Sequence, residues 1–211
     1  MSEESTGKIQ NLLQQAARQT ESPTPEASSV ASATRNFSSE AEAEQAFSHL
    51  REQLFRIEGW NKESEISSFA LFDQNGNSQS EKLAAVGDFI KITLPGSGKD
   101  DWVKIIEIHE TADEIVLSVQ PSENPTDKGS EQTTSHFFTA DSTNNFCLQR
   151  INTKLNFYVV GLNEKSNTEE TGGVLETVRN VAAANAGHYL GIQKAQWKTF
   201  CENFIAAEKQ K

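Results

Sequence analysis

The chain reads Phe146-Cys-Leu-Gln-Arg-Ile151, then Asn152-Thr-Lys154, then Leu155-Asn-Phe-Tyr-Val-Val160. Two apolar-rich segments joined by such a short polar connection are typical of a β-hairpin. Alternation of apolar and polar residues begins earlier, near Val86, and repeats in short segments that each end at turn residues. This pattern predicts antiparallel strands with one sheet face on a core and the other face in water.

Further strands are expected upstream, where short apolar segments are bounded by turn residues. Asp73-Gln-Asn-Gly76 is such a turn, and Pro95-Gly96 ends another segment. The segment at residues 102–109 is apolar on both faces over part of its length, so we place it inside the sheet. The expected strands are residues 66–72, 88–94, 102–109, 115–119 and 136–139, with a long polar loop at 121–134.

A helix is predicted before the strands. Ser39 and Glu42 have the spacing of a capping box, and Phe37 precedes them as a hydrophobic staple. Apolar residues then recur at helical spacing, and Gly59 is expected to end the helix because glycine suits the position after a helix. The apolar stripe consists of Ala43, Phe47, Leu50, Leu54 and Ile57.

After Gly161 the apolar spacing becomes helical again. One helix is expected over residues 174–187, and a second, carrying Trp197 and Phe200, runs to about Glu208. The order of helix, antiparallel strands and two helices is that of the α+β class. We therefore expect a single antiparallel sheet or a partly open small barrel, packed by an N-terminal helix and two C-terminal helices, in one domain spanning residues 37–211.

Residues 1–36 are expected to be a flexible N-terminal extension. Residues 20–36 contain no aromatic and only one β-branched aliphatic residue, so they cannot bury enough apolar area to offset the cost of ordering. A weak helical pattern over residues 3–19 leaves two alternatives open, a short docking helix on a tether or a frayed segment. We predict a protein partner, with this extension as a candidate contact.

The charge of the chain restricts its partners. A formal net charge of −11 disfavours nucleic acid, because phosphate neutralisation dominates that affinity, and it disfavours anionic membrane surfaces. No segment approaches the roughly 20 apolar residues that a membrane-spanning helix needs, and the N-terminus lacks the pattern of a signal peptide. We expect a cytoplasmic location, and the sequence does not indicate an oligomeric state.

The sequence carries no recognised catalytic or cofactor signature. It has no G-x-S-x-G, no phosphate-binding glycine loop and no C-x-x-C, and its four histidines lack the spacing of metal ligands. Cys147 and Cys201 lie on apolar segments and resemble small buried hydrophobes rather than thiolate nucleophiles. We therefore predict no catalytic residue, no metal and no cofactor, which favours a non-enzymatic protein.

Four polar residues on otherwise apolar segments are the candidate ligand-binding residues. They are His136, Arg150, Glu164 and Arg179. If Arg150 and Arg179 both face inward, they could pair with Glu164 and form the floor of a pocket for an anionic ligand. The alternative is ordinary salt bridging at the rim of the sheet.

In its element order, a sheet followed by a long C-terminal helix is similar to helix-grip domains. Those domains hold apolar ligands between sheet and helix, although they carry a helix pair among their strands that we do not expect here. The missing catalytic set and the N-terminal extension favour a non-enzymatic interaction or structural module of a soluble assembly. The alternative is a small-molecule binding domain, for an apolar or anionic ligand, with a pocket between the sheet and the C-terminal helix.

Overall fold

The structure is a computed structural model that describes residues 7–21, 28–64, 67–93, 100–126, 140–164 and 195–207. Two expected elements, the strand at residues 136–139 and the helix at residues 174–187, lie outside these ranges. No helix in the described part of the chain is both long and apolar enough to cross a lipid bilayer.

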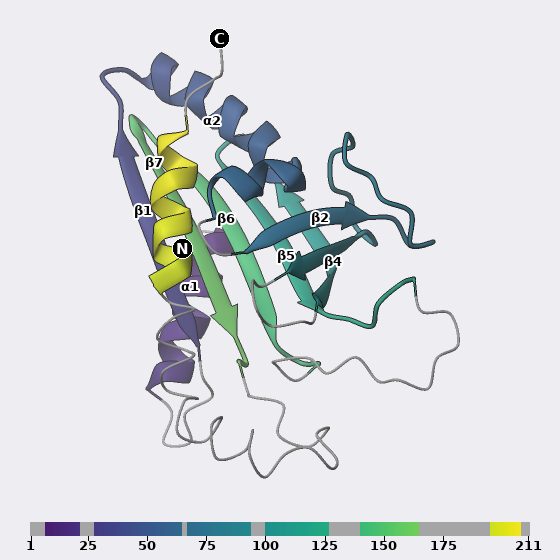
Figure 1. Cartoon of the computed structure of the whole chain (residues 1–211). Coiled ribbons are helices and arrows are strands. Elements are labelled where there is room, and N and C mark those ends of the chain that lie inside the picture. The colour runs from purple at the N-terminus through teal and green to yellow at the C-terminus, as the bar shows by residue number, and fades with distance from the viewer. Residues whose placement is uncertain are drawn as a thin grey trace.

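The centre of the molecule is one open sheet of seven antiparallel strands, in the order β1-β7-β6-β5-β4-β3-β2 (Figure 1). This confirms the α+β class and the antiparallel pairing. Because β1 and β2 lie at opposite ends of the order, the sheet is open rather than closed into a barrel. The strands are β1 (Ser29–Asn36), β2 (Ser68–Phe72), β3 (Phe89–Thr93), β4 (Asp100–Glu110), β5 (Glu114–Pro121), β6 (Thr143–Ile151) and β7 (Lys154–Leu162).

The hairpin predicted from the sequence is β6 and β7. Ile151 pairs with Lys154, so the connection has two residues, and the register continues without interruption to the pair Thr143 and Leu162. Asn152 adopts a φ of 54°. Asparagine tolerates this left-handed conformation better than most residues, which explains its place in the turn.

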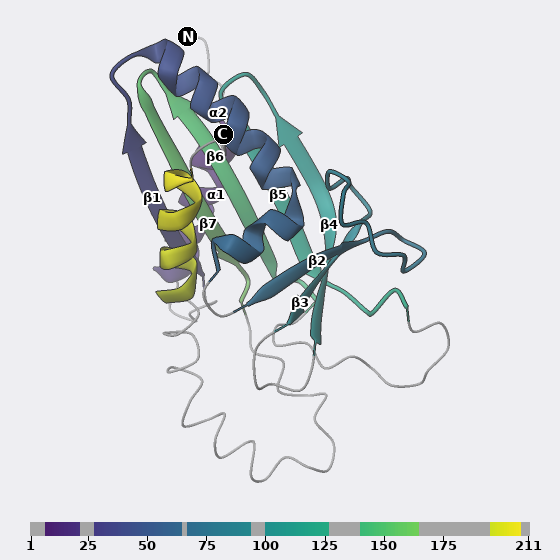
Figure 2. The same ribbon diagram turned by 45° about the horizontal axis from the view of Figure 1, so that its top comes forward.

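Helices cover both faces of the sheet (Figures 1 and 2). We call the inner face the one covered by α2 (Glu40–Phe55), by the 3-10 helix η1 (Ile57–Lys62) and by a C-terminal helix at residues 195–206. The outer face is covered in part by α1 (Lys8–Thr20). The strands therefore bury alternate residues against different helices, which explains why every residue of β5 from Ile115 to Val119 is buried.

The predicted start of α2 is confirmed, whereas its predicted end is wrong. The Ser39 side chain accepts a hydrogen bond from the backbone N–H of Glu42, as a capping residue does. The α-helix ends at Phe55, and Gly59 lies inside η1. Trp60 links η1 to the end of α2, because its Nε1 donates a hydrogen bond to the carbonyl oxygen of Leu54 at 3.2 Å.

Residues 29–36 correct the expectation of a flexible segment. They form β1, which pairs with β7 over eight successive residue pairs from Ser29–Gly161 to Asn36–Lys154. Small side chains suffice here because an edge strand is held by backbone hydrogen bonds to its neighbour and needs little apolar area of its own. Since β1 precedes α2 and η1, a helical segment does lie between the first and second strands, contrary to expectation.

The N-terminal helix α1 is neither frayed nor free on a tether. It lies on the outer face, where Lys8 pairs with Glu107 at 2.8 Å and Gln19 donates to Asn163 at 2.6 Å. Its apolar stripe is buried against the sheet in a second cluster. The buried residues of this cluster are Ile9, Leu12 and Ala16 from α1 with Val116, Cys147, Val160 and Leu162 from the strands.

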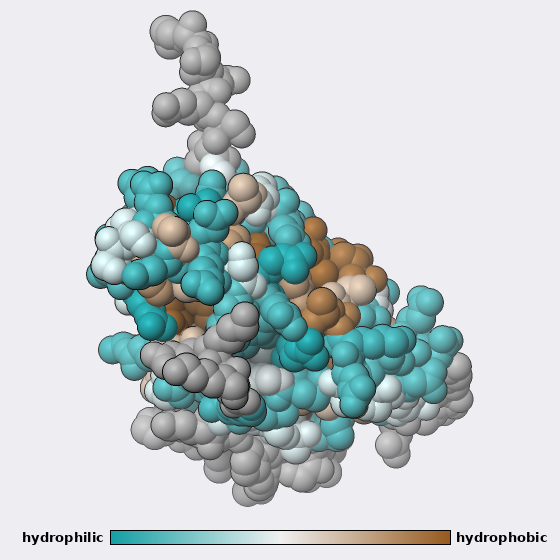
Figure 3. Space-filling view, turned by 90° about the horizontal axis from the view of Figure 1, so that it is seen from above, coloured by the Kyte–Doolittle hydropathy of each residue, from teal (hydrophilic) through white to brown (hydrophobic). Residues whose placement is uncertain are grey.

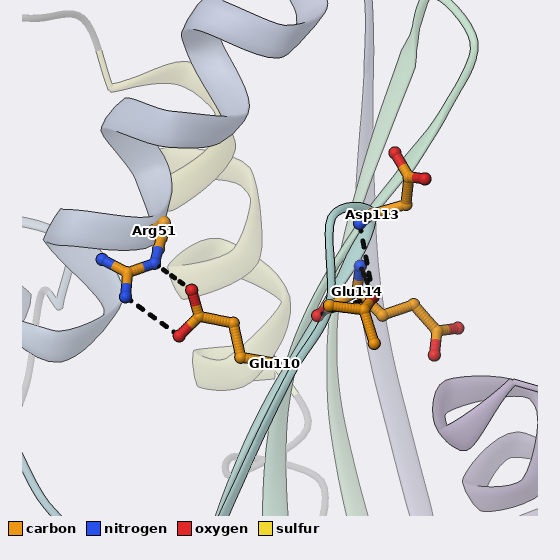
Figure 4. Close-up of polar contacts among 5 residues, drawn as sticks. Arg51, Glu110, Asp113 and Glu114 are labelled. Carbon is orange, nitrogen blue, oxygen red and sulfur yellow. Dashed lines mark hydrogen bonds and ion pairs between the residues drawn. The ribbon is translucent and has the colours of Figure 1, made fainter.

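At the upper end of the view in Figure 1, an ion pair connects α2 to the strand end beside the turn between β4 and β5. Arg51 of α2 forms a two-pronged ion pair with Glu110, the last residue of β4 (Figure 4). In the turn, the Thr111 hydroxyl accepts from the backbone N–H groups of Asp113 and Glu114, at 3.3 and 2.9 Å. The charged and polar side chains at this end of the sheet are therefore engaged in contacts that hold α2 and the β4–β5 turn in place.

Candidate functional site

The inner face is organised in rows of residues that face each other across neighbouring strands. Ser29 of β1, Gly161 of β7, Asn144 of β6 and Val119 of β5 are successive register partners at the lower end of Figure 1, where β7 ends. Side chains alternate along a strand, so Asn144 shares the inner face with Phe146. This row differs from the next ones because three of its four positions carry polar groups or glycine.

The carboxylate of Glu164 occupies the place of the missing Gly161 side chain. A Cβ atom on Gly161 would lie 2.0 Å from Glu164 Oε1 and 2.6 Å from the Ser29 hydroxyl oxygen. Glu164 is 2% exposed and Ser29 is 8% exposed, so both groups lie inside the protein. We use the name polar row for Ser29, the Glu164 carboxylate and Asn144, which follow each other across β1, β7 and β6.

Trp197, on the C-terminal helix, packs on β6 beside this row. Its ring lies edge-on to Phe146, with 5.4 Å between the ring centroids, and Phe146 follows Asn144 by two residues. Trp197 Nε1 and Asn144 Oδ1 are both buried, and among the described residues neither has a hydrogen-bond partner. A buried polar atom without a partner costs about 1–3 kcal/mol, so such atoms are characteristic of sites that bind a ligand or water.

The next two rows of the inner face are apolar. They face the aromatic side chains of η1 and the C-terminal helix, which we call the aromatic layer. Phe157 of β7 stacks on Phe204 of the helix with 4.1 Å between ring centroids, and Phe146 of β6 lies 4.5 Å from Trp60 of η1. Ring centroids at these separations are in contact. The residues of the two rows are Ala31, Val159, Phe146 and Leu117, followed by Ala33, Phe157, Leu148 and Ile115.

The opposite end of the inner face is basic. Arg35 and Arg150 flank Leu155 in the last row, where Arg150 pairs with Asp113 at 2.6 Å and Arg35 donates to the carbonyl oxygens of Ile205 and Ala206. Cations at the C-terminal end of a helix are favoured by the helix dipole, so Arg35 has a structural role.

The structure does not bring together Arg150 and Glu164, which corrects the proposed pairing. Arg150 pairs in register with Leu155, close to the hairpin turn, whereas Glu164 follows the far end of β7. Because a strand rises about 3.3 Å per residue, the two side chains lie at opposite ends of the sheet. His136 and Arg179, the other two candidates, lie outside the described residues.

Ser29, Asn144 and Trp197 are site residues that the sequence analysis missed. Ser29 lies within residues 1–36, which are expected to be a flexible extension, and Trp197 is expected only as part of the apolar face of the last helix. Asn144 precedes the apolar run that starts at Phe146, so a continued period of two would have placed it on the same face. No comparable sequence signal indicates that Glu164 folds over Gly161.

The structure does not support thiol or metal chemistry in the described residues. Burial raises the pKa of Cys201 to about 12, and it raises the pKa of Cys147 further, so both thiols are protonated at neutral pH. The carboxylates of Glu110 and Asp113, at the β4–β5 turn, form ion pairs with Arg51 and Arg150. Within the described ranges, no group of three metal-ligating side chains is placed to hold an ion.

Replacing Gly161 with alanine tests the packing of Glu164. The added methyl group must displace the Glu164 carboxylate and the Ser29 hydroxyl, and overpacking of this kind costs about 1–3 kcal/mol of unfolding free energy, measured by urea denaturation. Gly59→Ala is the matched control, because a Cβ atom there meets nothing within 4 Å. Equal stability of the two variants would contradict the placement of Glu164.

Comparisons with known proteins show a shared fold but no family. No family model matches the chain, and no curated protein matches it. A hypothetical protein from Helicobacter pylori is similar to it, with a TM-score of 0.53 and 9% identity over 87% of this chain and 89% of that chain. At this identity the likeness shows a common fold alone.

Two further solved structures have lower similarity. A protein from Thermus thermophilus has a TM-score of 0.46 and 8% identity, over 84% of this chain and 94% of that chain. A major latex-like protein from Panax ginseng has a TM-score of 0.34 and 9% identity, over 78% of this chain and 97% of that chain. At these TM-scores neither structure superposes closely on this chain.

Proposed function

We propose that this protein binds a small, mostly apolar ligand between the inner face of its sheet and the C-terminal helix. The observation that carries this proposal is the pair of buried polar atoms, Asn144 Oδ1 and Trp197 Nε1, that lack partners among the described residues. They lie at the end of an otherwise apolar layer. Ligand sites commonly combine apolar walls with a few polar groups that orient the ligand.

The element order supports the same proposal. One strand, two helical segments, six strands and a C-terminal helix across the sheet follow each other from β1 onward. This is the arrangement expected of a helix-grip domain, in which sheet and helix hold an apolar ligand, with α1 as an addition on the outer face. The proposed function is therefore supported both by the buried polar atoms of the site and by the fold.

The proposal is tested by titrating the full chain with Nile red, a neutral apolar dye whose emission rises in apolar surroundings. We expect saturable binding that Trp197→Phe weakens about five-fold, because a hydrogen-bond donor is lost at the site. Trp102→Phe is the matched control, since Trp102 packs on Phe72 on the outer face. Non-saturable binding, or equal effects of the two substitutions, would contradict the proposal.

A second candidate function is a protein-interaction module. It is favoured by Val86 and Ile106, which are 59% and 40% exposed and lie beside the two backbone hydrogen bonds that join Gly87 and Asp88 to Ile105. Figure 3 shows hydrophobic residues gathered in patches on the upper surface. Exposed apolar patches commonly mark contacts between proteins. A V86S/I106S variant that keeps dye binding but loses a partner recovered with the native chain would support this role.

A further inference from the structure

We propose that two copies of this chain associate through their β1 strands, which pair antiparallel across a two-fold axis and join the two sheets into one. This association does not depend on the proposed ligand. It follows from a difference between the two edges of the sheet. In Figures 1 and 2, β1 forms the left border of the sheet, and β2 is the last strand at the other end of the order.

The β2 edge is closed by η1 and by the turn that follows the strand. Phe69 donates its backbone N–H to Asn61 Oδ1 at 2.6 Å, and its carbonyl oxygen accepts from Asn61 Nδ2 at 3.0 Å. Leu71 donates its backbone N–H to Glu58 Oε1 at 3.1 Å, and its carbonyl oxygen accepts from the backbone N–H of Gln79 at 2.8 Å. The backbone groups that Phe69 and Leu71 direct away from β3 are therefore paired, and no further strand can add there without breaking these bonds.

The β1 edge is open in the part of the chain that the structure describes. The N–H of Phe37 donates to the carbonyl oxygen of Thr153, so the odd-numbered residues of β1 face β7. Val30, Ser32 and Thr34 then direct their N–H and C=O groups away from β7, and no hydrogen bond from a described residue reaches these groups. The strand has neither a proline nor a bulge, since its register with β7 is uninterrupted. An unprotected edge of this kind is a template for another strand.

A second copy is the occupant that leaves neither edge unpaired. A separate peptide strand would cover β1 but would bring a new free edge of its own. Two β1 strands satisfy each other, and the joined sheet then ends at both sides in a closed β2 edge. From Ser29 to Thr34 the strand carries no charged side chain, so it has no charge with which to select a charged peptide, and two copies meet there without like charges.

With Ser32 on the two-fold axis, each outward-facing residue meets an outward-facing residue of the second copy. Val30, whose side chain is 48% exposed, faces Thr34 of the second copy, and pairs of β-branched side chains on one face stabilise a sheet. Each such pair exchanges two backbone hydrogen bonds. Arg35, which donates to the C-terminal helix of its own copy, faces Ser29 of the second copy, so the two guanidinium groups lie at opposite ends of the contact.

Sedimentation equilibrium of the full chain, at concentrations from about 1 to 300 µM, tests the association. We expect a reversible monomer–dimer equilibrium with a dissociation constant in the micromolar range, because a single strand pair is a smaller contact than a standard stable interface. Each copy carries a net charge of −11, so the two copies repel each other at long range and the dissociation constant should fall as salt is added. A chain that stays monomeric at all these concentrations, with and without added salt, would overturn the inference.

A charge-swap experiment places the contact at β1. Ser32 is exposed, so Ser32→Lys and Ser32→Glu should leave the fold of the single copy intact. Each variant alone should raise the dissociation constant at least about tenfold, because like charges then lie opposite each other across the axis. An equal mixture of the two variants should associate about as tightly as the native chain. Ser68→Lys, at an exposed serine of the closed β2 edge, is the matched control and should associate like the native chain. Unchanged association of Ser32→Lys, or a mixture that stays monomeric, would overturn the pairing through β1.

Discussion

Replacing Phe200 with alanine should lower the free energy of unfolding by about 3–5 kcal/mol, the usual cost of removing a buried aromatic ring. Phe200 is 2% exposed and stands at the centre of the aromatic layer. Its ring lies within 6.3 Å, between centroids, of the rings of Trp60, Phe69, Phe146, Phe157, Trp197 and Phe204. Removing it leaves a cavity at the point where η1, the sheet and the C-terminal helix meet.

Urea denaturation of the full chain measures this effect. Lys198→Ala is the control on the same helix, because the Lys198 side chain is 69% exposed and its contact with Glu202 is 3.9 Å long. Exposed pairs of this kind contribute about 0.3–0.5 kcal/mol. A loss below about 1 kcal/mol for Phe200→Ala would mean that the C-terminal helix does not pack on the inner face as described.

Replacing Ile9 with aspartate should lower the free energy of unfolding by about 3 kcal/mol or more, because it places an unpaired charge in an apolar contact. Ile9 is 0% exposed and belongs to the outer cluster with Val116, Cys147 and Val160. To avoid burying the charge, α1 would have to leave the sheet and expose these residues.

The matched control is Gln10→Asp, one residue further along α1 on its exposed side. Denaturation compares the two variants, and limited proteolysis reports whether α1 has detached. Cleavage within α1 is expected in the Ile9 variant alone. Equal stability of both variants would restore the expectation that the N-terminal segment is independent of the core.

Local sequence patterns were sufficient to predict much of the architecture. The β6–β7 hairpin follows from two apolar segments and a two-residue turn, and the start of α2 follows from the capping geometry of Ser39 and Glu42. Both depend on residues close together in the chain, where spacing determines which backbone groups can meet. The antiparallel sheet and the α+β class could therefore be predicted.

Tertiary structure decided the role of the N-terminal segment. Residues 29–36 have a composition typical of a linker, yet they form β1 because β7 offers an unpaired edge more than a hundred residues away. Composition describes what a segment can bury by itself and contains no information about a distant backbone partner. For the same reason α1, with its weak apolar pattern, was not recognised as a cover of the outer face.

The candidate site was also decided by tertiary structure. Arg150 and Glu164 are 14 positions apart in sequence and look like partners, but the hairpin register sends them to opposite ends of the sheet. Ser29, Asn144 and Glu164 become neighbours because β1, β6 and β7 align in one row and because Gly161 leaves room for a carboxylate. Local periodicity in the sequence was enough to predict most of the strands and helices, with β1 as the main exception. Which side chains meet depended on strand register and helix packing, which are set by contacts across the whole chain.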